Sequence, residues 1–298
     1  MSIRPPPLLP GDTIGVMAPS SYVDRKDIEK STAFLEARGY KVFVHPQTYE
    51  RHNQSAGTGL QKALALQGLW QRDDIKAIWC ARGGNRAMHF VDMVTFAAMK
   101  DKPKILIGFS DVTVLLNALY AHTGIIGYHG PVFKDIHKHA QIEHTLKILA
   151  GEETGYDFST AAVLQDGNTT GHLIGGNLSL FQYLPQTLPG EFWKDSILFL
   201  EDCGEEISRL DRMLLHLKRI QLLDGISGLI FGEFTDLKDT GTPYGFSWED
   251  IVLEHTQGLN IPIITGAPFG HGDNLYTFPI GQKAASDTRK LSLMLMQP

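Results

Sequence analysis

A serine in segment 104–113 has the position that a nucleophile needs. An apolar, strand-forming run ends at Gly108 and a helix-like run begins at Val112, so Ser110 falls on the turn between them. There its hydroxyl would project above the sheet edge, and backbone N–H groups of the new helix could stabilise an oxyanion. The second glycine of a G-x-S-x-G elbow is missing, because Val112 occupies its position. The alternative is that Ser110 or Asp111 is simply the N-cap of the helix.

A serine nucleophile needs a base to take its proton and an acid to orient that base. Among the 12 histidines, His271 has the most distinctive setting, between Gly270 and Gly272. Flanking glycines let the backbone turn sharply and leave the imidazole unobstructed. The alternative is a histidine on a surface loop.

Glu201 is the candidate acid because it ends the apolar run 196–201. Burying a lone carboxylate is costly, so Glu201 needs either a partner or water. The alternative is a residue at a strand end that reaches solvent. Glu205 and Glu206 follow in an expected loop, where we expect them to be solvated.

The segment Arg82-Gly83-Gly84 follows another apolar run, 75–81. Glycine permits close backbone approach, so Gly83 or Gly84 could donate an N–H to an oxyanion. Arg82 could pair with a substrate carboxylate; a plain turn with a solvated arginine is the alternative. The spacing fits neither a P-loop nor a dinucleotide fingerprint. His137, His139 and His144 lack the spacing of metal ligands, so we expect no metal site.

The elements expected around these residues indicate an α/β fold. Strand-like runs at 13–17, 41–45, 75–81 and 104–109 alternate with helical patterns at 26–38, 60–71, 86–100 and 112–122. Such alternation predicts an N-terminal, parallel, doubly wound sheet domain. The loops 18–21, 81–84 and 108–111 would then meet at the carboxyl edge of the sheet, where sites of such folds lie.

The second half of the chain has shorter strand-like runs of mixed pattern. They lie at 172–174, 196–201, 228–234, 262–265, 275–280 and 291–295, and an amphipathic helix is expected at 208–219. A polar, turn-rich stretch separates the halves. We therefore expect an N-terminal domain at 1–155, a linker at 156–170, and a smaller, strand-rich C-terminal α/β domain at 171–298.

Bulk properties restrict the class of protein. The 298 residues are 43% apolar and 20% charged, as in ordinary globular proteins, and the net charge is -6. This acidic balance, without any basic block, argues against nucleic acid or an anionic membrane as partner. The two cysteines lie in apolar runs and suggest a reducing compartment. With no signal-peptide core or membrane-length apolar run in the sequence, we expect a cytoplasmic protein.

Taken together, the chain resembles the LD-carboxypeptidase (muramoyltetrapeptide carboxypeptidase) family, which includes a microcin-immunity branch. The resemblance covers nearly the whole chain in the expected order. It is carried by LPGDTIGVMAPSS (9–21), RGG (82–84), GFSDVT (108–113), HGP (129–131), GGNLS (175–179), FLED (199–202), LDRML (210–214), GHG (270–272) and PIG (279–281).

The resemblance implies a serine peptidase with no metal or other cofactor, in which Ser110 is the nucleophile, His271 the base and Glu201 the acid. It implies an oxyanion hole made by the amides of Asp111 and Gly84, and a homodimeric assembly. In the matched segments, Arg82, Gly83 and Asn177 are expected to contact the substrate.

The family also implies the reaction, namely hydrolysis of an L,D-peptide bond that releases a C-terminal D-amino acid from a murein tetrapeptide during recycling. The alternative is an immunity-type hydrolase that cleaves a peptidyl-nucleotide antibiotic or a related amide, with Trp70, Trp79, Trp193 and Trp248 as candidates to stack on the base. A non-catalytic binding protein on the same fold is a further alternative. Two departures from the family pattern, Asn85-Arg86 and Glu206-Ile-Ser208, bear on the choice of peptide.

Overall fold

The computed structural model describes residues 2–152, 155–156, 158–272 and 274–296. It divides into two compact units. The first consists of Met1–Thr154 and Tyr276–Gly281, and the second of Gly155–Leu275 and Gln282–Gln297. The predicted boundary at residue 155 adjoins residues 153–154, which lie outside the described part of the chain.

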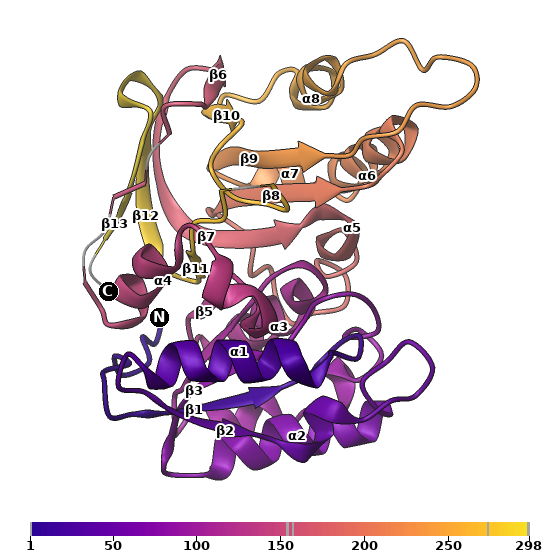
Figure 1. Cartoon of the computed structure of the whole chain (residues 1–298). Helices are drawn as coiled ribbons and strands as arrows, with labels where there is room; N and C mark the ends of the chain where they lie inside the picture. The colour runs from indigo at the N-terminus through magenta and orange to yellow at the C-terminus, as the bar shows by residue number, and fades with distance from the viewer. Residues whose placement is uncertain (1, 153–154, 157, 273, 297–298) are drawn as a thin grey trace. The chain divides into compact units, whose positions relative to one another are not determined.

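The first unit contains a six-stranded sheet (Figure 1). Its strands are β1 (Thr13–Met17), β2 (Lys41–Val44), β3 (Ile75–Cys80), β4 (Ile105–Gly108), β5 (Gly127–His129) and β11 (Phe278–Ile280). The order is β11-β5-β4-β3-β1-β2, and all neighbours are parallel except β11, which runs antiparallel to β5. The predicted parallel sheet therefore gains an antiparallel edge strand from late in the sequence.

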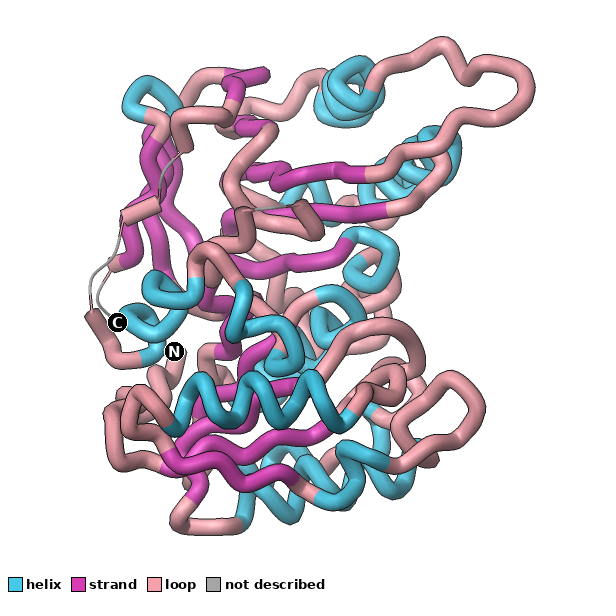
Figure 2. Tube along the Cα trace, viewed as in Figure 1, coloured by secondary structure: helices cyan, strands magenta, loops and turns pink. Residues whose placement is uncertain are grey.

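Helices cover both faces of this sheet. They are α1 (Arg25–Glu36), α2 (Gly59–Gln71), α3 (Thr113–Thr123) and α4 (Ile142–Leu149), with 3₁₀ turns η1 (Pro46–Tyr49), η2 (Val91–Met93), η3 (Phe96–Met99), η4 (Ser110–Val112) and η5 (Phe133–Lys138). From β1 the chain crosses to β2 on one side, and from β2 it crosses back past β1 to β3. The two crossovers run in opposite directions along the sheet. Because both are right-handed, α1 and α2 lie on opposite faces of the sheet, as Figures 1 and 2 show.

The helix predicted at 86–100 is wrong, because only η2 and η3 form there. Ala87, Phe90, Val91 and Val94 are buried at helical spacing. The next buried residue, Phe96, comes only two positions later, which breaks the period of 3.6.

The second unit contains a mixed seven-stranded sheet. Its strands are β6 (Ala162–Gln165), β7 (Asn168–Asn177), β8 (Ile197–Cys203), β9 (Gly228–Thr235), β10 (Ile263–Thr265), β12 (Lys283–Asp287) and β13 (Ser292–Leu295). In the order β13-β12-β7-β8-β9-β10-β6, the central strands β7 to β10 are parallel. The helical elements are α5 (Leu178–Phe181), α6 (Ile207–Arg219), α7 (Leu222–Gly225), α8 (Trp248–Thr256) and η6 (Thr288–Lys290).

The predicted fold class, a parallel α/β domain followed by a strand-rich α/β domain, is confirmed. The two compact units differ in two details from the domains expected at 1–155 and 171–298. The stretch 156–170, expected as a linker, contains β6 and the start of β7, and residues 276–281 return to the first unit. No helix in the described part of the chain is long and apolar enough to cross a bilayer.

Candidate active site

Ser110 follows β4 with a backbone conformation that few non-glycine residues adopt. Residues Ile105, Leu106 and Ile107 of the strand are fully buried, and Ser110 opens η4 with a φ of 63°. For an L-residue the left-handed region costs about 1–2 kcal/mol. A strained serine on a turn from strand to helix is the arrangement of a nucleophile elbow, in spite of the missing second glycine.

The capping alternative for Ser110 and Asp111 is wrong. The N-cap of α3 is Val112, that of η4 is Phe109, and neither turn has a side-chain cap. Ser110 therefore does not adopt its conformation in order to cap a helix.

The Arg82-Gly83-Gly84 loop lies directly against Ser110. A Cβ added to Gly83 would be 2.9 Å from the Ser110 Cβ and 3.2 Å from its Oγ. Gly84 has a φ of 116°, and a Cβ there would lie 2.1 Å from the Oγ of Ser21. Both positions thus require glycine, which leaves space beside the serine hydroxyl.

The loops after β1 and β3 are joined to each other. The Ser21 N–H donates to the Gly83 carbonyl at 3.3 Å, and the Arg82 guanidinium donates to the Tyr22 carbonyl at 3.0 Å. Since C=O and N–H point in opposite directions across a trans peptide, the Gly84 N–H points away from Ser21. The sheet order reverses between β1 and β3, which is where crevices form in doubly wound sheets.

Asp111 is almost fully buried next to Ser110. Its Oδ2 accepts a hydrogen bond from the Ala87 N–H at 2.8 Å, which ties the loop after β3 to η4. Burial raises the pKa of Asp111, although the Ser20 hydroxyl, the Ala87 N–H and the Lys62 ammonium counteract this effect. The backbone N–H of Asp111 belongs to the first turn of η4, where N–H groups lack an intrahelical acceptor.

Glu201 and His271 form a buried pair in the second unit. The Nδ1 of His271 lies 2.6 Å from the Oε2 of Glu201, a fully buried residue in the last half of β8. The other Glu201 oxygen is also buried and has no hydrogen-bond partner in the described part of the chain. The imidazole is 20% exposed. Neither residue therefore fits its surface alternative.

The glycines around His271 are needed for this contact. Gly270 has a φ of 133°, and a Cβ at Gly272 would lie 1.7 Å from the Oε2 of Glu233. The Glu233 N–H in β9 donates a hydrogen bond to the Phe269 carbonyl at 2.8 Å. The backbone can therefore turn tightly against β9 and direct the imidazole towards Glu201.

The charge state of His271 is set by its neighbours. Burial alone would lower its pKa, but side-chain hydrogen bonds to Cys203 and Glu201, with the Glu201 charge, raise the pKa to about 10. These neighbours therefore favour the protonated form of His271.

Cys203 is a neighbour of His271 that the sequence analysis missed. It is half-buried, and not buried as its apolar run suggested. Alternate residues of a strand share one face, so its spacing of two from Glu201 is the signal that could have found it.

Two further predicted residues have other partners than expected. Asn177 is buried beside Glu201 in the sheet register, and its amide donates to the Oδ1 of Asp202 at 2.9 Å. Glu205 is not solvated, because it accepts a hydrogen bond from Ser179 at 2.9 Å and pairs with Arg209 at 3.1 Å. The role of Asn177 in substrate binding remains a prediction.

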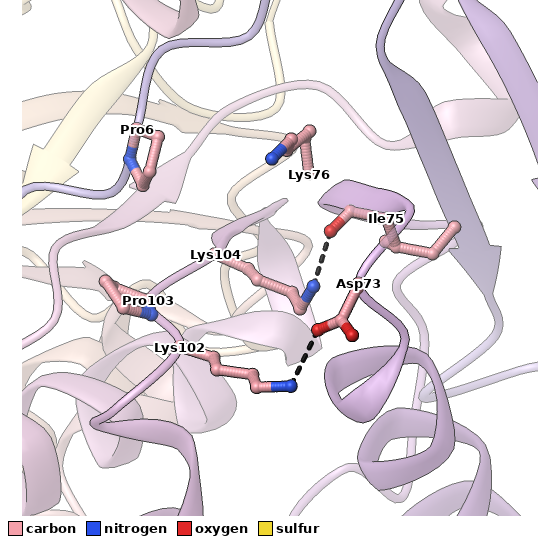
Figure 3. Close-up of a pocket in the computed structure, with 7 residues that line it drawn as sticks. All are labelled: Pro6, Asp73, Ile75, Lys76, Lys102, Pro103 and Lys104. Atoms are coloured by element: carbon pink, nitrogen blue, oxygen red, sulfur yellow. Dashed lines mark hydrogen bonds and ion pairs between the residues drawn. The ribbon is translucent and has the colours of Figure 1, made fainter.

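A hollow of about 220 Å³ in the first unit lies at the wrong edge of the sheet for this chemistry (Figure 3). It is lined by Ile75 at the start of β3 and by Lys104, just before β4, whereas Ser110 follows the end of β4. The Lys104 ammonium donates to the carbonyls of Arg72 and Ile75 at 2.6 and 2.5 Å. It thus satisfies backbone carbonyls at the amino edge of the sheet.

The structure gathers the predicted residues in two groups. Ser110, Asp111, Gly83, Gly84 and Arg82 lie together in the first unit. Glu201, His271 and Asn177 lie at the carboxyl ends of strands, or in the loop after one, in the second unit. One group contains the strained Ser110, and the other contains the His271–Glu201 pair.

Comparisons with known proteins agree with these features. Residues 14–130 match the LD-carboxypeptidase N-terminal domain, and residues 170–285 match the LD-carboxypeptidase C-terminal domain. The chain is 30% identical over 306 residues to the probable murein peptide carboxypeptidase of Bacillus subtilis, covering 99% of this chain and 95% of the relative. It is 27% identical to the microcin C7 self-immunity protein MccF of Escherichia coli, covering 94% and 92%.

A solved structure supports the same conclusion. The muramoyltetrapeptide carboxypeptidase from Oxalobacter formigenes matches with a TM-score of 0.84 and 27% identity, covering 95% of this chain and 97% of the other. The chain therefore belongs to the LD-carboxypeptidase family and is a carboxypeptidase.

Proposed function

We propose that the protein is a serine carboxypeptidase that hydrolyses an L,D-peptide bond and releases the C-terminal D-amino acid of a murein tetrapeptide. The observation that carries the serine mechanism is the strained Ser110 after β4, together with the 2.6 Å Glu201–His271 pair. The substrate class comes from relatives described as murein peptide and murein tetrapeptide carboxypeptidases.

In the proposed reaction His271 takes the proton of Ser110 while the serine oxygen attacks the scissile carbonyl carbon. A carboxylate accepts hydrogen bonds, so Glu201 holds the proton on Nδ1 and leaves Nε2 to act as base. The imidazolium then protonates the leaving amine. Water, deprotonated by the same imidazole, hydrolyses the acyl-enzyme and restores Ser110.

The backbone amides of Asp111 and Gly84 are the proposed oxyanion donors. The Asp111 N–H lies in the first turn of η4, and the Gly84 N–H points away from the loop after β1. Each donor of this kind typically contributes about 100- to 1,000-fold to kcat. Arg82 and Gly83, in the same loop, are proposed to contact the peptide.

The raised pKa of His271 gives the mechanism a pH dependence. The base must be neutral to accept the serine proton, and hydrogen bonds to Cys203 and Glu201 raise its pKa to about 10. We expect kcat/KM to increase from neutral pH towards pH 10 in a pH–rate profile. A flat profile over that range would show that the resting pair does not limit the reaction.

The tryptophans give little support to the immunity-type alternative. Trp70, Trp79 and Trp248 are at most 9% exposed, and only Trp193 is half-buried, next to Phe192. Stacking on a nucleotide base requires an accessible ring face. Among the tryptophans of this chain, that leaves Trp193 alone as a candidate.

The decisive experiment offers purified protein three substrates, namely a murein tetrapeptide ending in D-alanine, its diastereomer ending in L-alanine, and a peptidyl-nucleotide amide. Mass spectrometry follows the products, and Ser110→Ala is the control. We expect release of D-alanine only, and a loss of about 10⁴-fold or more in Ser110→Ala. Cleavage of the nucleotide substrate alone supports the immunity-type activity, and full activity of Ser110→Ala excludes the serine mechanism.

A homodimeric assembly and a cytoplasmic location are part of this proposal. Light scattering after size-exclusion chromatography tests the first. Fractionation of cells that produce the protein tests the second.

A further inference from the structure

Glu233 is a half-buried carboxylate beside the His271 turn that the proposed mechanism does not use. It lies on β9, which pairs with β8 in the sheet of the second unit (Figure 1). Its Oε2 is buried. A Cβ added to Gly272 would overlap this oxygen, so the carboxylate contacts the backbone of the residue that follows His271.

A β-bulge places Glu233 in this position. The register of the β8–β9 ladder shifts between two regular pairs, so that two residues of β9, Gly232 and Glu233, lie opposite one residue of β8, Glu201. Bulges of this kind bend a strand and redirect a side chain, often next to active sites. The bulge therefore puts a second glutamate across from the acid that holds His271.

The bulge also contacts the start of the turn that carries the base. The Glu233 N–H donates to the Phe269 carbonyl at 2.8 Å, and a Cβ at Gly232 would overlap that carbonyl oxygen. A Cβ added to Gly270 would lie 3.3 Å from the Cβ of Glu201 and 3.3 Å from that of Glu233. Residue 270 is therefore enclosed by both glutamates.

The turn 270–272 needs restraint from outside, because glycines flank His271 on both sides. Glycine has more backbone freedom than any other residue. The 2.6 Å contact between Nδ1 and Glu201 nevertheless requires the imidazole to stay in one place. Glu233 restrains both ends of the turn, since its Cβ lies against Gly270 and its carboxylate against Gly272.

We propose that Glu233 is a positioning residue for catalysis: its side chain, directed by the bulge in β9, fixes the turn 270–272 and so holds the imidazole of His271 on Glu201. The proposal rests on the proposed function, since it takes His271 as the base. The role depends on the size of the side chain and not on its charge. Glutamine, which has nearly the same shape, should therefore replace Glu233, and alanine should not.

The activity test compares wild type, Glu233→Gln and Glu233→Ala. A misplacement of about 1 Å at a catalytic group can cost about 100-fold in rate, so we expect Glu233→Ala to lose about 10- to 100-fold in kcat with little change in KM. Glu233→Gln should keep most of the wild-type kcat. Glu254→Ala removes an exposed carboxylate from α8 in the same unit and is the matched control, with unchanged kcat. Equal losses in Glu233→Gln and Glu233→Ala would overturn the positioning role.

A double-mutant cycle tests the contact itself. Gly272 has no left-handed conformation, and the atoms nearest to an added Cβ all belong to the Glu233 carboxylate. We expect Gly272→Ala to lower kcat about 10-fold or more in wild type, and to cause no further loss in Glu233→Ala, where the space is empty. Losses that simply multiply would show that the two residues act independently and would overturn the proposal. Gly272→Ala retains Glu233, so an unchanged kcat in this variant overturns the proposal even if Glu233→Ala does not fold.

A second measurement does not depend on activity. Hydrogen bonds to Cys203 and Glu201 raise the pKa of His271 to about 10, and both residues are present in every variant. Because the bond to Glu201 requires a fixed imidazole, NMR titration should give His271 a pKa closer to 6.5 in Glu233→Ala than in wild type or Glu233→Gln. A general loss of stability would lower Tm without changing the pKa of the folded protein.

Unchanged kcat and an unchanged His271 pKa in Glu233→Ala, with Ser110→Ala inactive, would overturn the role of Glu233 and leave the serine mechanism intact. If instead Ser110→Ala is fully active, the proposed function fails. The titration still shows in that case whether Glu233 holds the imidazole.

Discussion

Ser110, the residue whose hydroxyl begins the proposed reaction, has a strained backbone conformation. Its φ of 63° is uncommon for a residue with a side chain, and no capping bond accounts for it. Strained residues persist where the surrounding structure imposes them, and they often do so at functional sites. Here Gly83 on one side and the fully buried β4 on the other restrict the backbone conformation of Ser110.

Replacing Ser110 by glycine should therefore separate stability from activity. Glycine adopts a positive φ without strain, so Ser110→Gly should stabilise the fold by about 1 kcal/mol. Ser110→Ala keeps the strain and is the matched control. Both variants should be inactive. Denaturant unfolding measures the difference, and a Ser110→Gly protein less stable than Ser110→Ala would contradict the strain argument.

The two neighbouring carboxylates, Glu201 and Glu205, have separate roles at the residue scale. The amide of a glutamine at 201 can donate to Nδ1 and so select the wrong imidazole tautomer. A comparable loss of the orienting acid costs about 10⁴-fold in kcat, so we expect a severe loss in Glu201→Gln. Glu205→Gln weakens only contacts to Ser179 and the half-exposed Arg209, and surface pairs contribute about 0–1 kcal/mol. Steady-state kinetics of both variants provide the check, and the reverse ranking would make Glu205 the acid.

At the scale of elements, the loop after β3 depends on glycine at defined positions. An alanine at Gly84 would require a φ of 116° and would bring its Cβ within 2.1 Å of the Ser21 Oγ. We expect Gly84→Ala to destabilise the protein by about 1–3 kcal/mol and to lower kcat. Gly68→Ala in α2 is the control, since nothing lies within 4 Å of the added Cβ, and it should stabilise by about 0.5–1 kcal/mol. Equal effects of the two changes on Tm would argue against a rigid loop.

The sequence predicts elements well where the apolar pattern is regular. Strand Thr13–Met17 and the helices at α1, α2 and α6 form within one or two residues of their predicted bounds. The sequence does not predict which strands pair when they lie far apart along the chain. Strand β11, which is only three residues long, pairs with β5, whose partner residues lie about 150 positions earlier, and no local pattern contains that information. The spacing of two from Glu201 could have indicated that Cys203 shares its strand face. The sequence does not show, however, that the loop after β10 returns to place His271 beside both residues.

At the scale of the whole molecule, His271 in the second unit and the buried Lys62 of α2 in the first have shifted pKa values, and the two shifts have opposite effects on the pH dependence of stability. In the second unit the pKa of His271 rises from 6.5 to about 10. In the first unit the pKa of Lys62 falls from 10.5 to about 8. Between pH 6.5 and 10 folded His271 binds a proton that the unfolded chain has lost, so its stabilisation disappears as the pH rises through 10. Between pH 8 and 10.5 the unfolded chain binds a proton that folded Lys62 has lost, so stability increases.

Single variants should separate these opposing contributions. Removing the partner of His271 in Glu201→Gln should make stability less dependent on pH between 6.5 and 10, because the raised pKa requires the hydrogen bond to Glu201. Lys62→Met should abolish the increase between pH 8 and 10.5. Denaturant unfolding of wild type and both variants at matched pH values measures the two slopes. If the free energy of unfolding depends on pH in the same way in all three proteins, neither group titrates with the shift described. A group whose pKa differs between the folded and unfolded states makes the free energy of unfolding depend on pH.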